Sequence, residues 1–316
     1  MLTLIAKDFK LLFSAEGSVK KRLLSALATV LMAAFAVGIE LFIFTAILSK
    51  IQKYNNASLP FLTLFLFIIS CLMILIDTVG AAKLFFNEKD NEQLLRRPIT
   101  NGQIVSSKLV FLFCSHYVMT FLLVYPIMVS YGILIGKHMW FYYAGIFYPA
   151  LSFLFEGGLA LILVYPYKLL SDFLKKHMIV QFALALLLMI GGCVVYSYVL
   201  GIFMELVVNN NINAIFTQNS INTLIEVRSY FVPLNFLVDS FFRGSSARMF
   251  SYLCIAGGIF ILGTSLIVFS FSYLRSVAIH QRAGKTKEAL HITKPYVALI
   301  KKELFLQQLP RILISF

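Results

Sequence analysis

The chain contains six runs of predominantly apolar residues, each long enough to cross a lipid bilayer as a helix. A crossing helix needs about 20 such residues, because the hydrocarbon core is about 30 Å thick. The runs cover residues 23–48, 60–82, 108–136, 141–165, 178–208 and 251–274. Hydrophobic residues make up 60% of the sequence and charged residues only 13%, which excludes an ordinary soluble domain. We therefore predict an all-α integral membrane protein with a six-span membrane domain over residues 23–274.

Basic residues are concentrated in alternate connections between these runs. Of the 27 Lys and Arg residues, 21 lie before the first run, between runs two and three, between runs four and five, or after the sixth. The positive-inside rule places such connections in the cytoplasm. We expect a multi-pass protein of the plasma (inner) membrane with both termini cytoplasmic. The net charge of +13 has the same origin. The sequence has no basic stripe with interleaved aromatic residues, so we do not expect nucleic acid as a partner.

The sequence lacks the patterns of a metal site or of an enzyme. Its four cysteines lie in four different apolar runs, and its five histidines have no second ligand at a credible helical spacing. The string Gly284-Lys285-Thr286 is not a phosphate-binding loop, because Ile279 stands where that motif requires glycine. We therefore predict no catalytic residue, no metal and no cofactor in this chain.

Two segments outside the runs have amphipathic or short helical patterns. Residues 1–22 carry Leu2, Ile5, Phe9 and Leu12 at helical spacing, which predicts a helix lying along the inner membrane surface. The connection 209–250 begins with a polar stretch, after which Pro233 can open a short apolar helix. That helix should end near Gly244, and it is too short to cross the membrane. We expect such short helices on the outer face before span six.

The cytoplasmic connection between spans two and three predicts another short helix. Asn87 can begin it, and Pro98 ends it. Thr100 and Gln103 then form a T-x-x-Q capping box that starts the third span. A helix of about eight residues is marginal alone in water, so we expect it to dock on a surface, which another protein can supply.

Three acidic residues lie inside the first, second and fourth predicted spans. They are Glu40 in the first, Asp77 near the inner end of the second and Glu156 near the middle of the fourth. A charge at mid-bilayer costs about 2.5–3.5 kcal/mol on insertion scales, so each acid is a candidate for a substrate pathway or for proton transfer. Structural roles compete with this interpretation, since Asp77 could reach the interface near Lys83 and Glu40 could pair with a neighbouring tyrosine.

The layout of spans and the stretch LFFNEKDNEQLLRRPITNGQIVSSKL resemble the permease subunit of type-2 ATP-binding cassette (ABC) exporters. That stretch is similar to the coupling segment of this class, with a Leu-Leu pair, a proline a few residues later and a Ser-Lys pair opening span three. The resemblance implies an N-terminal elbow helix and a separate ATPase subunit, which binds ATP and magnesium. It also implies that the segment docks on this ATPase through Glu88, Asp90, Glu92, Leu94, Leu95, Arg96 and Arg97.

The basic tail, residues 275–316, repeats part of the N-terminal pattern. Shifted by 295 residues, the positions Leu4, Ile5 and Lys7 match Leu299, Ile300 and Lys302. One interpretation is that the tail begins a second six-span half, and chance similarity is the other. Under the ABC hypothesis the chain works as a homodimer or beside a second permease subunit, in contact with membrane lipid.

We therefore expect a permease that carries a substrate outward when its ATPase partner closes on ATP. Two alternatives stay open on the sequence. An ion-coupled secondary transporter would use Glu156 or Glu40 for proton or sodium coupling. A membrane scaffold or immunity-type protein would transport nothing.

Overall fold

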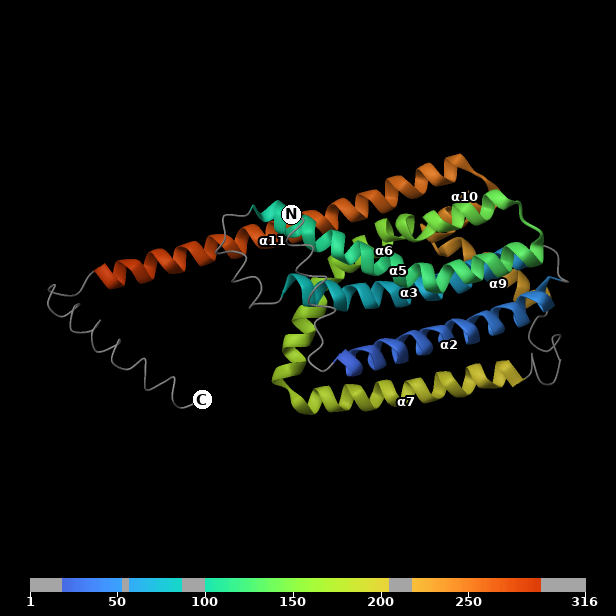
Figure 1. The fold of residues 1–316 in the computed structure, drawn as a ribbon, viewed down its shortest axis with the longest axis horizontal. Helices are drawn as coiled ribbons and strands as arrows, with labels where there is room; N and C mark the ends of the chain where they lie inside the picture. Colours follow the sequence, from blue (N-terminus) through green and yellow to red (C-terminus); the bar gives the residue numbers. More distant parts are fainter. Residues whose placement is uncertain (1–18, 53–56, 87–99, 205–217, 291–316) are drawn as a thin grey trace. The chain divides into compact units, whose positions relative to one another are not determined.

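In a computed structural model of the chain, the described residues 19–52, 57–86, 100–204 and 218–290 are almost entirely helical and contain no strand (Figure 1). The helices are α2 (Val19–Ile51), α3 (Ser58–Phe85), α5 (Asn101–Ile135), α6 (Met139–Lys176), α7 (Met178–Phe203), α9 (Gln218–Tyr230), α10 (Leu234–Arg243) and α11 (Ser246–Leu290). The chain divides into two compact units, residues 1–268 and 269–316, and α11 continues from one into the other. Helices α2, α3, α5, α6, α7, α9 and α10 belong to the first unit.

Among the residues that the structure describes, five helices are long and apolar enough to cross a membrane: α3, α5, α6, α7 over Met178–Tyr198, and α11 over Ser246–Ser270. They coincide with five of the six predicted spans. The first predicted span, 23–48, lies within α2, which is 33 residues long and has a described apolar stretch of Ala34–Ser49. The architecture is thus that of a multi-pass helical membrane protein.

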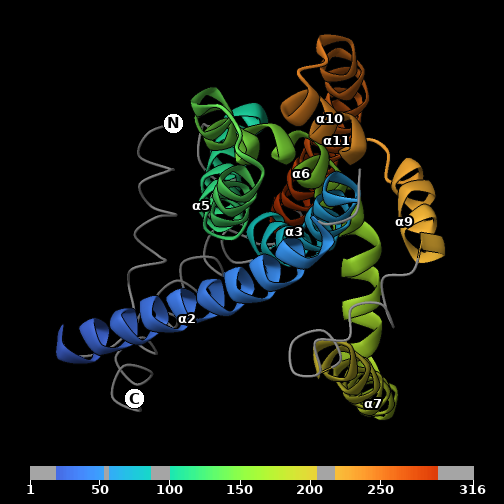
Figure 2. The same cartoon turned by 90° about the vertical axis from the view of Figure 1, so that its right-hand side faces the viewer.

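The centre of the first unit is formed by α3, α5 and α6, which pack against one another (Figure 2). α2 packs mainly on α5, while the short helices α9 and α10 pack on α3, and α10 also contacts α6. The core that these helices share is rich in aromatic rings. Phe44 of α2 stacks on Phe61 of α3, and Tyr131 of α5 meets Phe242 of α10 edge to face.

Several helix ends follow the signals in the sequence. The capping box at the start of α5 is confirmed, because the Thr100 side chain accepts from the Gln103 backbone nitrogen and the Gln103 side chain accepts from the Thr100 nitrogen. α10 begins after Pro233, as predicted. It ends at Gly244, which adopts a left-handed conformation with φ of 68° that residues with a side chain rarely take.

α7 differs from the central helices in its surroundings. It packs on α6, and each of its side chains that the structure describes is exposed, although the helix is strongly apolar. In water this surface would favour aggregation. Lipid or another membrane protein must therefore cover α7.

Candidate functional site

Three ionisable side chains meet in the interior of the helical bundle. Asp77 belongs to α3, His116 to α5 and Glu156 to α6, so each central helix contributes one member. Their exposed fractions are 3%, 0% and 2%. We call these residues the buried triad. His116 lies about 20 Å from the start of α5 at 1.5 Å per residue, which is well inside a span of this length.

His116 is held by hydrogen bonds on both sides of its ring. Nδ1 lies 2.6 Å from Oδ2 of Asp77. Nε2 lies 3.2 Å from the hydroxyl oxygens of both Ser152 and Thr120. The Ser152 hydroxyl also donates to the Pro149 carbonyl at 3.2 Å. These bonds fix the orientation of the imidazole between α3 and α6.

The second carboxylate approaches the same ring nitrogen without reaching hydrogen-bond distance. Oε2 of Glu156 lies 3.6 Å from Nε2 of His116. That oxygen is buried and has no hydrogen-bond partner among the described residues. The Ser70 hydroxyl of α3 is a hydrogen-bonding neighbour of the Glu156 carboxylate. A buried polar atom without a partner is rare, and it commonly marks a site of function or of ligand binding.

Aromatic residues surround the triad and keep water away from it. The Phe153 ring lies 5.1 Å from the His116 ring, measured between centroids. Tyr148 and Tyr252 are fully buried near Glu156, and the Tyr252 hydroxyl donates to the Leu151 carbonyl at 2.8 Å. α11 therefore helps to enclose the site through Tyr252.

A buried lysine joins the helix ends that border the predicted coupling segment. Lys108 of α5 is 1% exposed, and its ammonium group donates to the Leu84 carbonyl in the last turn of α3. A buried ammonium needs such polar partners, because desolvation penalises its charge. The end of α3 and the beginning of α5 are consequently linked by a charged hydrogen bond.

A second polar cluster lies near α9 and α10. Asp239 of α10 is fully buried and forms ion pairs with Arg228 of α9, Arg243 of α10 and Arg248 of α11. The Arg228 guanidinium also donates to the Thr63 hydroxyl of α3 at 3.0 Å. Burial, with the nearby Arg243 and Arg248 charges, lowers the pKa of Arg228 to about 10, so its cation persists at neutral pH. The cluster binds four helices together.

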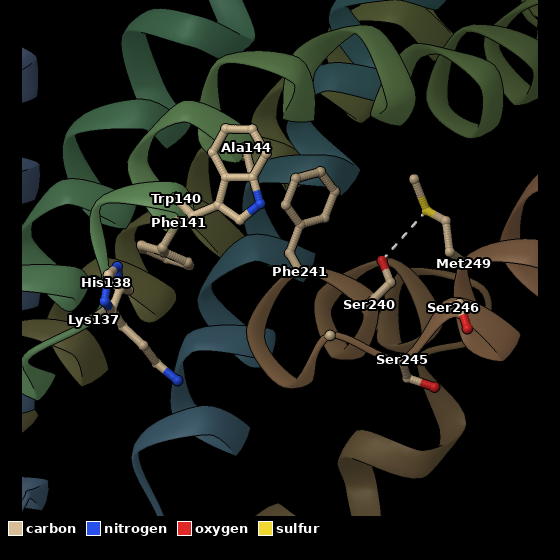
Figure 3. Close-up of a pocket in the computed structure, with 11 residues that line it drawn as sticks. Lys137, His138, Trp140, Phe141, Ala144, Ser240, Phe241, Ser245, Ser246 and Met249 are labelled. Atoms are coloured by element: carbon tan, nitrogen blue, oxygen red, sulfur yellow. Dashed lines mark hydrogen bonds between the residues drawn. The ribbon is translucent and has the colours of Figure 1, made fainter.

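A pocket of about 450 Å³ lies beside this cluster, between the start of α6 and the turn from α10 to α11 (Figure 3). Trp140 and Phe241 both contribute aromatic rings to its lining, while the Ser240 hydroxyl donates to the Met249 sulfur at 3.4 Å. Lys137 donates to the Phe242 carbonyl at 3.3 Å. The pocket is lined by Lys137, His138, Trp140, Phe141, Ala144, Ser240, Phe241, Gly244, Ser245, Ser246 and Met249.

The sequence-predicted site residues fall into three groups. Glu156 and Asp77 lie together in the triad, so Asp77 is buried against His116 and does not extend toward an interface near Lys83. Glu40 lies on α2, and within the described part of the chain its buried Oε2 has no hydrogen-bond partner, so a pairing with tyrosine is not seen for this atom. The predicted elbow positions 1–18, all seven coupling residues and the tail positions 291–316 lie outside the described residues.

Sequence reasoning missed His116, Lys108 and the Asp239 cluster. The available signal was an ionisable residue within or beside an apolar run, and His116 carries it as clearly as Glu156 does. Nothing in the sequence indicates the partner of each group, because the partners lie on other helices.

Comparison of the chain with known protein families, curated proteins and solved structures finds no match. Inferences about function therefore rest on the residues and their geometry.

Proposed function

We propose that this chain is the membrane permease subunit of an ATP-driven exporter, related in layout to the type-2 ABC class. In this proposal the chain forms the substrate pathway, and a separate ATPase subunit binds ATP and magnesium. The protein lies in the plasma membrane with both termini in the cytoplasm, and α9 and α10 lie on the outer side. The chain itself catalyses no reaction.

The observation that carries the proposal is the link between the two helices that border residues 87–99. Because Lys108 donates to the Leu84 carbonyl, the last turn of α3 and the second turn of α5 are held together. The capping box at Thr100 fixes where α5 begins. A partner that moves the segment 87–99 would therefore displace two helices as one unit, which is the mechanical requirement of a coupling segment.

The same two helices lead from that segment to the buried triad. Asp77 lies two turns before the end of α3, and His116 lies four turns into α5. Asp77 and His116 contact each other directly, and His116 also lies next to Glu156 of α6. Displacement of α3 and α5 relative to α6 would therefore change the triad first. This supports a pathway in which ATP-driven movement reaches the middle of the membrane.

The exposed apolar surface of α7 supports a partner within the membrane. Phe182, Leu187 and Tyr196 are each more than 60% exposed. We infer that a second copy of the chain, or a second permease subunit, covers part of this surface and that lipid covers the remainder. Six spans would then form half of a transporter.

The decisive experiment replaces the leucine pair of the coupling segment. We expect Leu94→Asp with Leu95→Asp to insert normally but to lose co-purification with the ATPase and substrate-stimulated ATP hydrolysis, because buried apolar anchors dominate binding at such interfaces. The matched control is Leu169→Asp with Leu170→Asp, which places the same charges on exposed positions near the end of α6. The control should keep the complex. A stable complex with the Leu94 and Leu95 variant would overturn the proposal.

A further inference from the structure

We propose that the buried triad is a proton-binding site in which His116, as an imidazolium, bridges the carboxylates of Asp77 and Glu156. The inference goes beyond the proposed function, since an ATP-driven permease needs no bound proton. It depends on the geometry of three side chains and holds with or without an ATPase partner.

The hydrogen-bond pattern at the His116 ring supports a proton on each of its nitrogens. The 2.6 Å separation of Nδ1 and Asp77 Oδ2 leaves room for a hydrogen and nothing larger, and an ionised carboxylate can only accept. Nδ1 is therefore the donor in this bond. A neutral imidazole would accept at Nε2 from the Thr120 or Ser152 hydroxyl, and among the described residues it would leave the buried Glu156 Oε2, 3.6 Å away, with neither a donor nor an opposite charge. An ionised carboxylate oxygen in that state is costly in a dry interior.

A proton on Nε2 places an opposite charge beside Glu156 Oε2. The imidazolium would donate from Nε2 toward the Ser152 and Thr120 oxygens at 3.2 Å, and its charge would lie 3.6 Å from Glu156 Oε2. This distance is that of an ion pair. Ser152 is suited to accept because its own hydrogen can be given to the Pro149 carbonyl.

The net charge of the triad also favours a bound proton. With both carboxylates ionised and a neutral imidazole, the triad would carry two negative charges inside the membrane. A single buried charge is already costly there. One proton on His116 halves the net charge and supplies an opposite charge to each carboxylate. A proton also needs no cavity, which suits side chains that are at most 4% exposed.

Other titratable groups near Glu156 do not replace His116 in this role. Cys71 comes from α3, Tyr148 from α6 and Tyr252 from α11, and each is an electrostatic neighbour of Glu156. Thiols and phenols ordinarily lose their protons above pH 8. These three groups therefore stay neutral at physiological pH and supply no positive charge to the carboxylates.

A proton that holds α3, α5 and α6 together makes the folded protein sensitive to pH. By linkage, stability falls with rising pH wherever the folded state binds more protons than the unfolded state. For one proton, the unfolding constant should rise tenfold per pH unit over the range in which only the folded state keeps it. Thermal unfolding of the full chain in nanodiscs, measured between pH 5.5 and 8.5, should therefore show a falling midpoint.

Matched variants assign the effect to the triad. Glu156→Gln and Asp77→Asn should each reduce the pH dependence, because each removes one of the charges that retain the proton. His177→Gln, at an exposed position at the end of α6, should keep it in full. A pH-independent midpoint for the unsubstituted chain, or an unchanged pH dependence in Glu156→Gln, would overturn the proposal.

A spectroscopic measurement keeps the test independent of folding. In the full chain labelled with ¹⁵N-histidine, one ring should show two protonated nitrogens at pH 7.5, because the proposed imidazolium donates from both Nδ1 and Nε2. That signal should be absent from His116→Gln. If this variant fails to fold, the assignment is made by a shift of the same signal in Glu156→Gln. A spectrum with only neutral rings at pH 7.5 would contradict the proposal.

Discussion

Gly158 of α6 and Phe260 of α11 lie so close that a Cβ atom added to Gly158 would be 2.9 Å from both the backbone nitrogen and the Cα of Phe260. Gly263 continues this contact, since its added Cβ would lie 2.7 Å from the Gly158 carbonyl oxygen. Small residues let membrane helices approach in this way. The contact positions α11 beside Glu156, two residues before Gly158.

Gly158→Ala should destabilise the protein. The new methyl group meets backbone atoms that cannot rotate away, and overpacking of this kind costs about 1–3 kcal/mol. Gly257→Ala is the control, because a Cβ there meets nothing within 4 Å and alanine favours a helix over glycine. Thermal unfolding in detergent should therefore give opposite signs for the two variants. Equal midpoints would show that α6 and α11 can separate freely.

Asp239→Asn should be strongly destabilising. The change removes the charge that neutralises the buried Arg228 guanidinium, and breaking a buried ion pair costs about 3–5 kcal/mol. Asp172→Asn is the control, since that carboxylate is 46% exposed and pairs with Lys168 and Lys175 near the surface. We expect little change in the control by the same unfolding measurement. A mild effect of Asp239→Asn would mean that water reaches the cluster.

Lys108→Met should weaken the coupling between ATP hydrolysis and transport without preventing the ATPase subunit from binding. Methionine fills a similar volume but cannot donate to the Leu84 carbonyl, and a charged hydrogen bond of this kind contributes about 1.5–3 kcal/mol. Under the proposed function, ATPase binding should persist while substrate-stimulated ATP hydrolysis and transport decrease. Lys83→Met, at an exposed position in the same part of α3, should behave like the unsubstituted chain.

The orientation in the membrane can be tested by thiol labelling. In a background without Cys71, Cys114, Cys193 and Cys254, single cysteines replace Asn91 or Asn210. An impermeant thiol reagent added to intact cells should label the Asn210 position and not the Asn91 position, because the basic residues put 83–108 in the cytoplasm. The reverse pattern would invert the topology.

The sequence by itself determined the class of protein and many of its helix boundaries. Apolar runs require lipid as a solvent, and only helices satisfy their own backbone groups over such a length in a chain of this pattern. Local chemistry also determined where α5 and α10 begin, because a capping box and a proline act within one turn. These two helix starts could therefore be predicted without any knowledge of tertiary contacts.

Tertiary structure alone decided which side chains meet. The spans are apolar around their whole circumference, so their sequences do not indicate which face packs against a neighbour. Asp77 and His116 are 39 positions apart, and Ser152 follows His116 by 36, so no local spacing connects them. These residues meet only because α3, α5 and α6 have particular positions along the bundle axis and particular rotations about their own axes. Side-chain packing between the helices sets both. That packing converts three separate ionisable residues into one buried triad.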